Sequence, residues 1–239
     1  ANLTSLGKQI AHIHHSYGIP DRLFNFVTCE NWRDAGRTLY EGITEHMDDA
    51  EKTAFDQCIG VNEAVIMRSA TQQSEEPEKQ DPTGVWVQND WYLPISAEQF
   101  KGELPDIKAA ELMQNFGSFL TQKMYTNNTS NAVIAYHGYL AGYELLAEAA
   151  NSTEIAALLD EAYEEINQKL VAELHVNPEQ QEAFAKKARE KYTDWTIVDR
   201  LLRHGKDPLR KQGAQDSLLA HASMAHAHGI YPRVIIETI

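Results

Sequence analysis

The sequence predicts a chain in two parts, an α/β region up to about residue 100 and an all-helical region after it. Short segments rich in β-branched and aromatic residues alternate with helical patterns in the first part, whereas only helical spacing follows Pro105. The chain has 239 residues, enough for one large domain or two small ones. Hydrophobic residues make up 43% of it, which allows a buried core and excludes a largely disordered chain. We therefore expect domains over 1–100 and 101–239.

In the first part, helices are separated by short strands. Residues 6–17 and 32–58 have helical spacing, and Asp48 is the expected N-cap of a second helix within the latter. The polar segment 70–84 contains two prolines and predicts an exposed loop. Runs of β-forming residues predict strands over 23–28, 61–68 and 85–93.

In the second part, helical patterns follow one another without strands. They cover 108–124, 131–149, 153–174, 178–192, 195–204 and 216–228. Gly138 and Gly142 share one face of such a helix, which favours close packing against a neighbour. The acidic stretch 161–165 is typical of a solvated helix face.

Both chain ends suggest a fragment of a longer protein. The sequence opens on a helical pattern with no strand before it. Its last residues, 234–239, are apolar and uncapped, so we expect them to expose hydrophobic surface.

The composition excludes several classes of protein. Lys and Arg number 21 against 35 Asp and Glu, and the resulting formal net charge of −14 repels nucleic-acid phosphates. Cys29 and Cys58 are too few for a disulfide framework or a thiolate metal site, and they fit a cytoplasmic protein. No run of about 18 apolar residues predicts a membrane span, and no secretory signal is visible. We expect neither nucleic acid nor membrane as a partner.

The histidines do not predict a metal site. His221, His226 and His228 are separated by five and two residues, so their rings point to different faces of a helix. Zinc sites on helices instead pair histidines four residues apart. We therefore expect no metal cofactor.

A lysine and several amides lie close together between residues 123 and 131. Lys123 is expected near the end of one helix, and the Asn-Asn-Thr-Ser sequence at 127–130 is expected to form a turn and N-cap before the next. A partly buried lysine with a lowered pKa can take the proton of an alcohol, while an adjacent amide donates a hydrogen bond to the developing alkoxide. These residues therefore suit alcohol oxidation. The alternative is that Lys123 is a solvated cation at the C-terminus of a helix and that the asparagines only cap the next helix.

Several motifs in one order resemble those of the long-chain polyol dehydrogenases, the mannitol dehydrogenase family. These motifs are Cys29-Glu30-Asn31, Ile59 to Arg68, Gln99-Phe100-Lys101-Gly102, Lys123 to Gly142 and Asp207-Pro208-Leu209-Arg210-Lys211. The resemblance implies that 1–100 is the C-terminal part of a Rossmann-type dinucleotide-binding domain and that 101–239 is a helical substrate domain. It also implies NAD-dependent oxidation of a small-molecule polyol or polyol phosphate, of the mannitol 1-phosphate to fructose 6-phosphate type.

The resemblance also implies roles for individual residues. Lys123 matches the general base of the family, and Asn128 and Asn31 match the amides that polarise the reacting oxygen. Asn131 stands where the family has histidine; an amide can hold a substrate hydroxyl but does not exchange protons near neutral pH. Gln88 similarly replaces a glutamate that relatives usually have.

A basic segment is the candidate for the distal end of the substrate. Residues 200–211 contain five of the 21 basic residues of an acidic chain. The resemblance implies that Arg210 and Lys211 face the substrate, where they can bind a phosphate. The alternative is a solvated basic face that balances the acidic helices. Ser217 occupies the place of a further family arginine.

The glycines do not form a nucleotide-binding loop. None of the 13 glycines is placed as Gly-x-Gly, the sequence that lets a backbone approach a pyrophosphate. We therefore expect the NAD-binding loop to lie outside this sequence and these residues by themselves to be inactive. The alternative function is a non-catalytic sugar-phosphate-binding or interaction protein, in which the missing loop and Asn131 are native losses.

Overall fold

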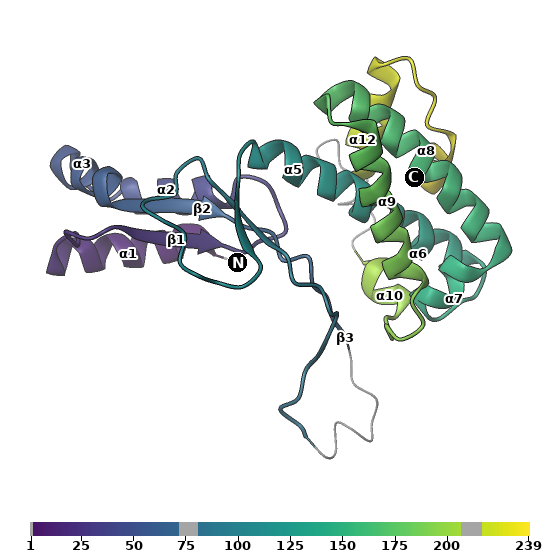
Figure 1. The fold of residues 1–239 in the computed structure, drawn as a ribbon, viewed down its shortest axis with the longest axis horizontal. Coiled ribbons are helices and arrows are strands. Elements are labelled where there is room, and N and C mark those ends of the chain that lie inside the picture. The colour runs from purple at the N-terminus through teal and green to yellow at the C-terminus, as the bar shows by residue number, and fades with distance from the viewer. Residues whose placement is uncertain (1, 72–80, 207–216) are drawn as a thin grey trace. The chain divides into compact units, whose positions relative to one another are not determined.

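The computed structural model describes residues 2–71, 81–206 and 217–239 (Figure 1). Contacts divide the chain into two compact units, one of Ala1–Ser69 with Asn89–Leu120 and one of Ala70–Gln88 with Thr121–Ile239. A small parallel α/β region precedes a mainly helical part, which confirms the predicted fold class. The domain ranges 1–100 and 101–239 stay a prediction, because the two units are defined by contacts alone.

The first unit begins with a helix and a parallel pair of strands joined by two further helices. β1 (Phe24–Thr28) and β2 (Ile59–Glu63) pair with Phe26 opposite Val61. Asp48 caps α3 (Asp49–Cys58) as predicted, since its Oδ1 accepts a hydrogen bond of 2.8 Å from the N–H of Glu51. The helices are α1 (Leu3–Tyr17), α2 (Ala35–Thr44) and α3 (Asp49–Cys58).

A second parallel pair corrects the prediction for residues 85–124. β5 (Leu93–Ser96) pairs with β6 (Ala110–Met113), so a strand follows Pro105 and the helix predicted from residue 108 begins only at Phe116. Pairing with β5 outweighs the helix propensity of Ala-Glu-Leu-Met. The predicted strand 85–93 is also wrong in extent. Its observed part, β4 (Trp86–Val87), pairs with β3 (Ala70–Thr71) in the second unit.

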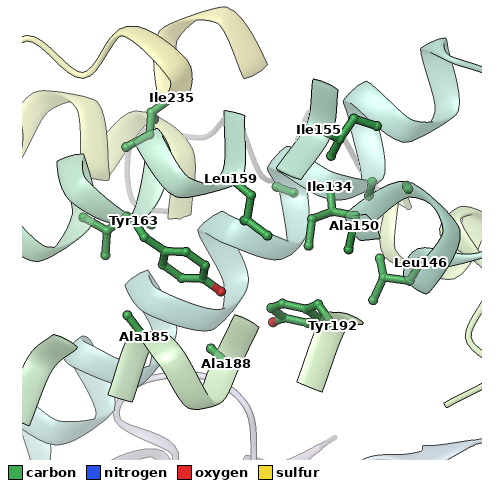
Figure 2. Packing of buried hydrophobic residues seen from close by; sticks show 14 of the residues in the cluster. Ile134, Leu146, Ala150, Ile155, Leu159, Tyr163, Ala185, Ala188, Tyr192 and Ile235 are labelled. Carbon is green, nitrogen blue, oxygen red and sulfur yellow. The ribbon is translucent and has the colours of Figure 1, made fainter. Parts of the chain in front are cut away.

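The second unit is mainly helical and has one large core (Figure 2). In this core, α6 (Ser130–Leu140), α8 (Thr153–Leu174) and α9 (Pro178–Thr193) pack together. The core includes Ile134, Leu159, Tyr163 and Tyr192. In the described ranges no helix combines the length and the apolar character needed to cross a bilayer. Helix α5 (Phe116–Lys123) crosses the boundary between the units after Leu120. The helices that follow it are η1 (Met124–Thr129), α6 (Ser130–Leu140), α7 (Leu146–Asn151), α8 (Thr153–Leu174), α9 (Pro178–Thr193), α10 (Leu201–His204), α12 (Ser217–Ala227) and α13 (Arg233–Thr238).

The last helix corrects two expectations. Val234 and Ile235 of α13 are fully buried, so the C-terminal segment packs into the unit instead of exposing these side chains. Glu165, expected on a solvated face, is buried as well. Its carboxylate accepts hydrogen bonds from the N–H groups of Val234 and Ile235, at 2.8 and 3.3 Å. A helix N-terminus thus receives the acidic partner that it favours.

The two glycines of the α6 segment have different roles. A Cβ at Gly138 would lie 2.7 Å from Cβ of Ala149 and 3.0 Å from Cδ1 of Leu201, so Gly138 permits close packing as predicted. Gly142 does not pack: no atom lies within 4 Å of its Cβ position, and its φ is +84°. It ends α6 in a Schellman turn, in which the N–H of Tyr143 donates to the carbonyl of Gly138.

We expect Gly138→Ala to lower the free energy of unfolding by about 1–3 kcal/mol, because the added methyl overlaps two packed side chains. The matched control is Gly117→Ala, since Gly117 lies in helix α5 and has open space at its Cβ position. The control should raise the free energy of unfolding by roughly 0.5–1 kcal/mol. Urea unfolding measures both. Equal effects of the two substitutions would contradict the packing role of Gly138.

Candidate active site

One uninterrupted helical run carries Lys123, Asn128 and Asn131. The expected turn and N-cap at 127–130 is wrong, because both Thr129 and Ser130 have right-handed helical backbone angles. The chain forms a π-helical segment, η1, between α5 and α6. A π-helix absorbs extra residues without breaking the helix, and such segments are frequent at functional sites.

The π-helical segment changes the angular spacing of Lys123, Asn128 and Asn131 along the helical run. Lys123 and Asn128 are five residues apart, which in an α-helix of 3.6 residues per turn would place them about 140° apart. In a π-helix, hydrogen bonds join residues five apart, so such residues lie one above the other. Asn131 follows Asn128 by three residues, the spacing of neighbours on an α-helix. Helix spacing therefore predicts that Lys123, Asn128 and Asn131 lie on one side of this run.

Buried hydroxyl groups hold the backbone of η1. Ser130 Oγ donates a hydrogen bond of 2.6 Å to the carbonyl of Thr126, and Tyr192 Oη donates one of 2.8 Å to the carbonyl of Asn127. Gln181 contributes Nε2, which lies 3.1 Å from Oγ1 of Thr126. Tyr192 and Gln181 both belong to α9, so this helix fixes the segment between Lys123 and Asn128.

Lys123 is buried, with 8% of its surface exposed. Burial lowers its pKa from 10.5 to about 8, and the positive charge of Lys191 on α9 contributes to the decrease. The alternative of a solvated cation at a helix end therefore does not hold. An amine with this pKa is partly unprotonated near neutral pH and can accept a proton.

Because Lys191 adds a repelling charge, Lys191→Gln should raise the pKa of Lys123 above its present value of about 8. The matched control is Lys187→Gln, an exposed lysine one turn earlier on α9, which should leave that pKa unchanged. Titration followed by NMR of isotope-labelled lysine measures the pKa in both variants. An identical titration of Lys123 in Lys191→Gln and in the wild type would show that burial alone lowers it.

Asn131 contacts a histidine–aspartate pair that the sequence did not predict. Its Nδ2 lies 2.7 Å from Nδ1 of His204, and Nε2 of His204 lies 2.7 Å from Oδ2 of Asp199. Burial acts to raise the pKa of Asp199, but hydrogen bonds from His204 and Arg203 outweigh it, so the pKa is lowered. His204 is 73 residues from Asn131, and only the packing of α10 on α6 brings the two together.

The other predicted site residues are placed as follows. Asn31 belongs to the first unit, where it is exposed and comes three residues after the end of β1. Arg210 and Lys211 lie outside the described residues. The roles of Asn31, Arg210 and Lys211 stay predictions.

His221 is a buried residue beside η1. Its Nδ1 lies 3.3 Å from Oγ1 of Thr129, and burial together with the charge of Lys169 lowers its pKa well below the ordinary value. His221 therefore stays neutral in the core. Among the described side chains, no group of three or more His, Cys, Asp or Glu residues is arranged to hold a metal ion.

Comparison with known proteins gives matches over most of the chain. Residues 115–239 match the family model of the mannitol dehydrogenase C-terminal domain. A mannitol-1-phosphate 5-dehydrogenase of Bacillus pumilus is 30% identical over 203 residues, which are 85% of this chain and 53% of that protein. One of Anoxybacillus flavithermus is 26% identical over 204 residues, with the same two coverages of 85% and 53%. The chain spans about half the length of the curated relatives it matches.

Two solved structures share the fold. The crystal structure of D-sorbitol dehydrogenase in substrate-free form aligns with a TM-score of 0.79 and 15% identity, covering 98% of this chain and 50% of that one. The ternary complex of Pseudomonas fluorescens mannitol 2-dehydrogenase with NAD and D-mannitol aligns with a TM-score of 0.71 and 14% identity, covering 98% and 49%.

Proposed function

Because the chain belongs to the mannitol dehydrogenase family, we propose that it carries the general base of an NAD-dependent enzyme that oxidises a sugar alcohol or sugar-alcohol phosphate. The observation that supports this most is Lys123, a buried amine with a pKa of about 8, one π-helical turn from Asn128. The names of the curated relatives favour a polyol 1-phosphate as the substrate.

In the proposed reaction, the residues of this chain move the proton and stabilise the oxygen. The neutral Nζ of Lys123 takes the proton of the substrate hydroxyl. The carbon that bears this hydroxyl loses its hydrogen as a hydride, and the C–O bond becomes a carbonyl. The amide of Asn128 donates a hydrogen bond to the oxygen as negative charge develops on it. Arg210 and Lys211 bind the distal phosphate.

NAD, when bound, supplies the acceptor for the hydride that leaves the carbinol carbon. Asn31 follows the carboxyl end of β1 in a parallel pair, the edge at which α/β sheets bind ligands. The sequence has no Gly-x-Gly for the pyrophosphate, so the residues present do not fit the whole dinucleotide. We therefore assign no contact between this chain and NAD.

A substrate panel assayed with the full-length protein tests the proposal. Mannitol, sorbitol and their phosphates are each incubated with NAD, and NADH formation is followed by absorbance. We expect oxidation of at least one of these compounds. Binding of a sugar phosphate without turnover would instead indicate the non-catalytic alternative.

A further inference from the structure

We infer that His204 and Asp199 are positioning residues, which orient the Asn131 carboxamide so that its oxygen accepts a hydrogen bond from a substrate hydroxyl. The inference rests on the proposed function, and it concerns Asn131, which stands where the family has a histidine. Asp199, His204 and Asn131 form a chain of hydrogen bonds in which each partner can only donate or only accept at the contact.

The first step fixes the proton on His204. Asp199 is buried, and its carboxylate accepts hydrogen bonds from Arg203 as well as from Nε2 of His204, which lies 2.7 Å from Oδ2. An ionised carboxylate can only accept, so Nε2 must carry the hydrogen. In the tautomer that carries its hydrogen on Nε2, Nδ1 is an acceptor.

The second step fixes the amide of Asn131. Nδ2 of Asn131 lies 2.7 Å from Nδ1 of His204, and of the two ends of the amide only the NH2 group can donate a hydrogen bond. The reversed amide would place two acceptors against each other. Since oxygen and nitrogen lie on opposite sides of the amide carbon, Oδ1 of Asn131 points away from His204.

The third step concerns this oxygen. Oδ1 of Asn131 is buried and makes no hydrogen bond with the described residues. A buried acceptor without a partner costs about 1–3 kcal/mol, which a hydroxyl donor would recover. Asn131 lies one helical turn beyond Asn128, and a polyol carries a second hydroxyl on the carbon beside the reacting one. The donor that the inference assigns to this oxygen is a neighbouring hydroxyl of the same substrate.

Backbone contacts keep His204 in place. The N–H of Leu146 donates to the carbonyl of Asp199 at 2.9 Å, and the N–H of Leu201 donates to the carbonyl of Glu144 at 3.0 Å. Leu201 is buried against Gly138 of α6, the helix that carries Asn131. The backbone is therefore anchored at Asp199 and at the first residue of α10, as a positioning role requires.

The test compares His204→Leu, His204→Asn and Asn131→Leu in the full-length protein with mannitol 1-phosphate. His204→Leu removes the acceptor for the amide and should raise KM roughly 3- to 10-fold with a smaller change in kcat, the scale of one neutral hydrogen bond. His204→Asn retains an acceptor near Nδ1 and should restore most of the affinity. The double variant of His204→Leu with Asn131→Leu should be no weaker than Asn131→Leu alone.

Controls separate this inference from the proposed function. Leu202→Ala changes an exposed residue of the same short helix and should leave KM and kcat unchanged. Calorimetric titration with mannitol 1-phosphate repeats the comparison without turnover. Equal affinities of the wild type, His204→Leu and His204→Asn would overturn the orienting role alone. No binding and no turnover by the wild type would overturn the proposed function and this inference with it.

Discussion

Replacing Lys123 by alanine in the full-length protein should lower kcat for polyol oxidation by roughly 100-fold or more, the usual scale for loss of a general base. The alanine variant keeps Asn128 and the helical run, so substrate binding should change much less than kcat. Steady-state kinetics with NAD in excess measures both quantities. NAD binding should be unchanged.

The pH profile makes this expectation specific to the lysine. Oxidation needs the unprotonated amine, whose fraction increases as the pH rises through a pKa of about 8. The wild-type rate should therefore increase with pH up to about 8 and then become constant. The residual activity of Lys123→Ala should lack this pH-dependent increase. Lys123→Arg, which stays charged, should be as slow as the alanine variant. An active Lys123→Ala protein with the wild-type profile would exclude Lys123 as the base.

The second large effect is expected at Arg210. Arg210→Ala should raise KM for a phosphorylated polyol by about 10- to 100-fold, the scale of a lost charge-assisted hydrogen bond. KM for the free polyol should change little, because that substrate has no charge for the guanidinium to bind. Lys187→Ala on the exposed face of α9 is the control for a lost positive charge. Equal changes for both substrates would remove the phosphate-binding role.

Much of the fold could be predicted from periodicity and caps. The long helix over 153–174 and the capped helix after Asp48 were predictable because local patterns determine them. The strand β6 was not, because Ala-Glu-Leu-Met favours a helix and only the distant strand β5 makes it extended. The burial of α13 likewise depends on Glu165, 69 residues before Val234.

The candidate site was predictable in its residue types but not in its geometry. The cluster around Lys123 could be found from the sequence, yet regular spacing gives no indication of the π-helical segment between Lys123 and Asn128. Its stability depends on hydroxyl groups such as that of Tyr192, 65 residues from the carbonyl it contacts. The contact of His204 with Asn131 equally exists only in the folded unit.

The most direct test follows the hydrogen atom on the reacting carbon. Mannitol 1-phosphate deuterated at C5 is incubated with the full-length protein and NAD, and the nicotinamide is analysed by NMR and mass spectrometry. The proposed function predicts one deuterium on the nicotinamide ring for each ketone formed, in the wild type and at a much lower rate in Lys123→Ala. Reduced NAD without deuterium, or no reduced NAD with any polyol of the panel, would contradict it.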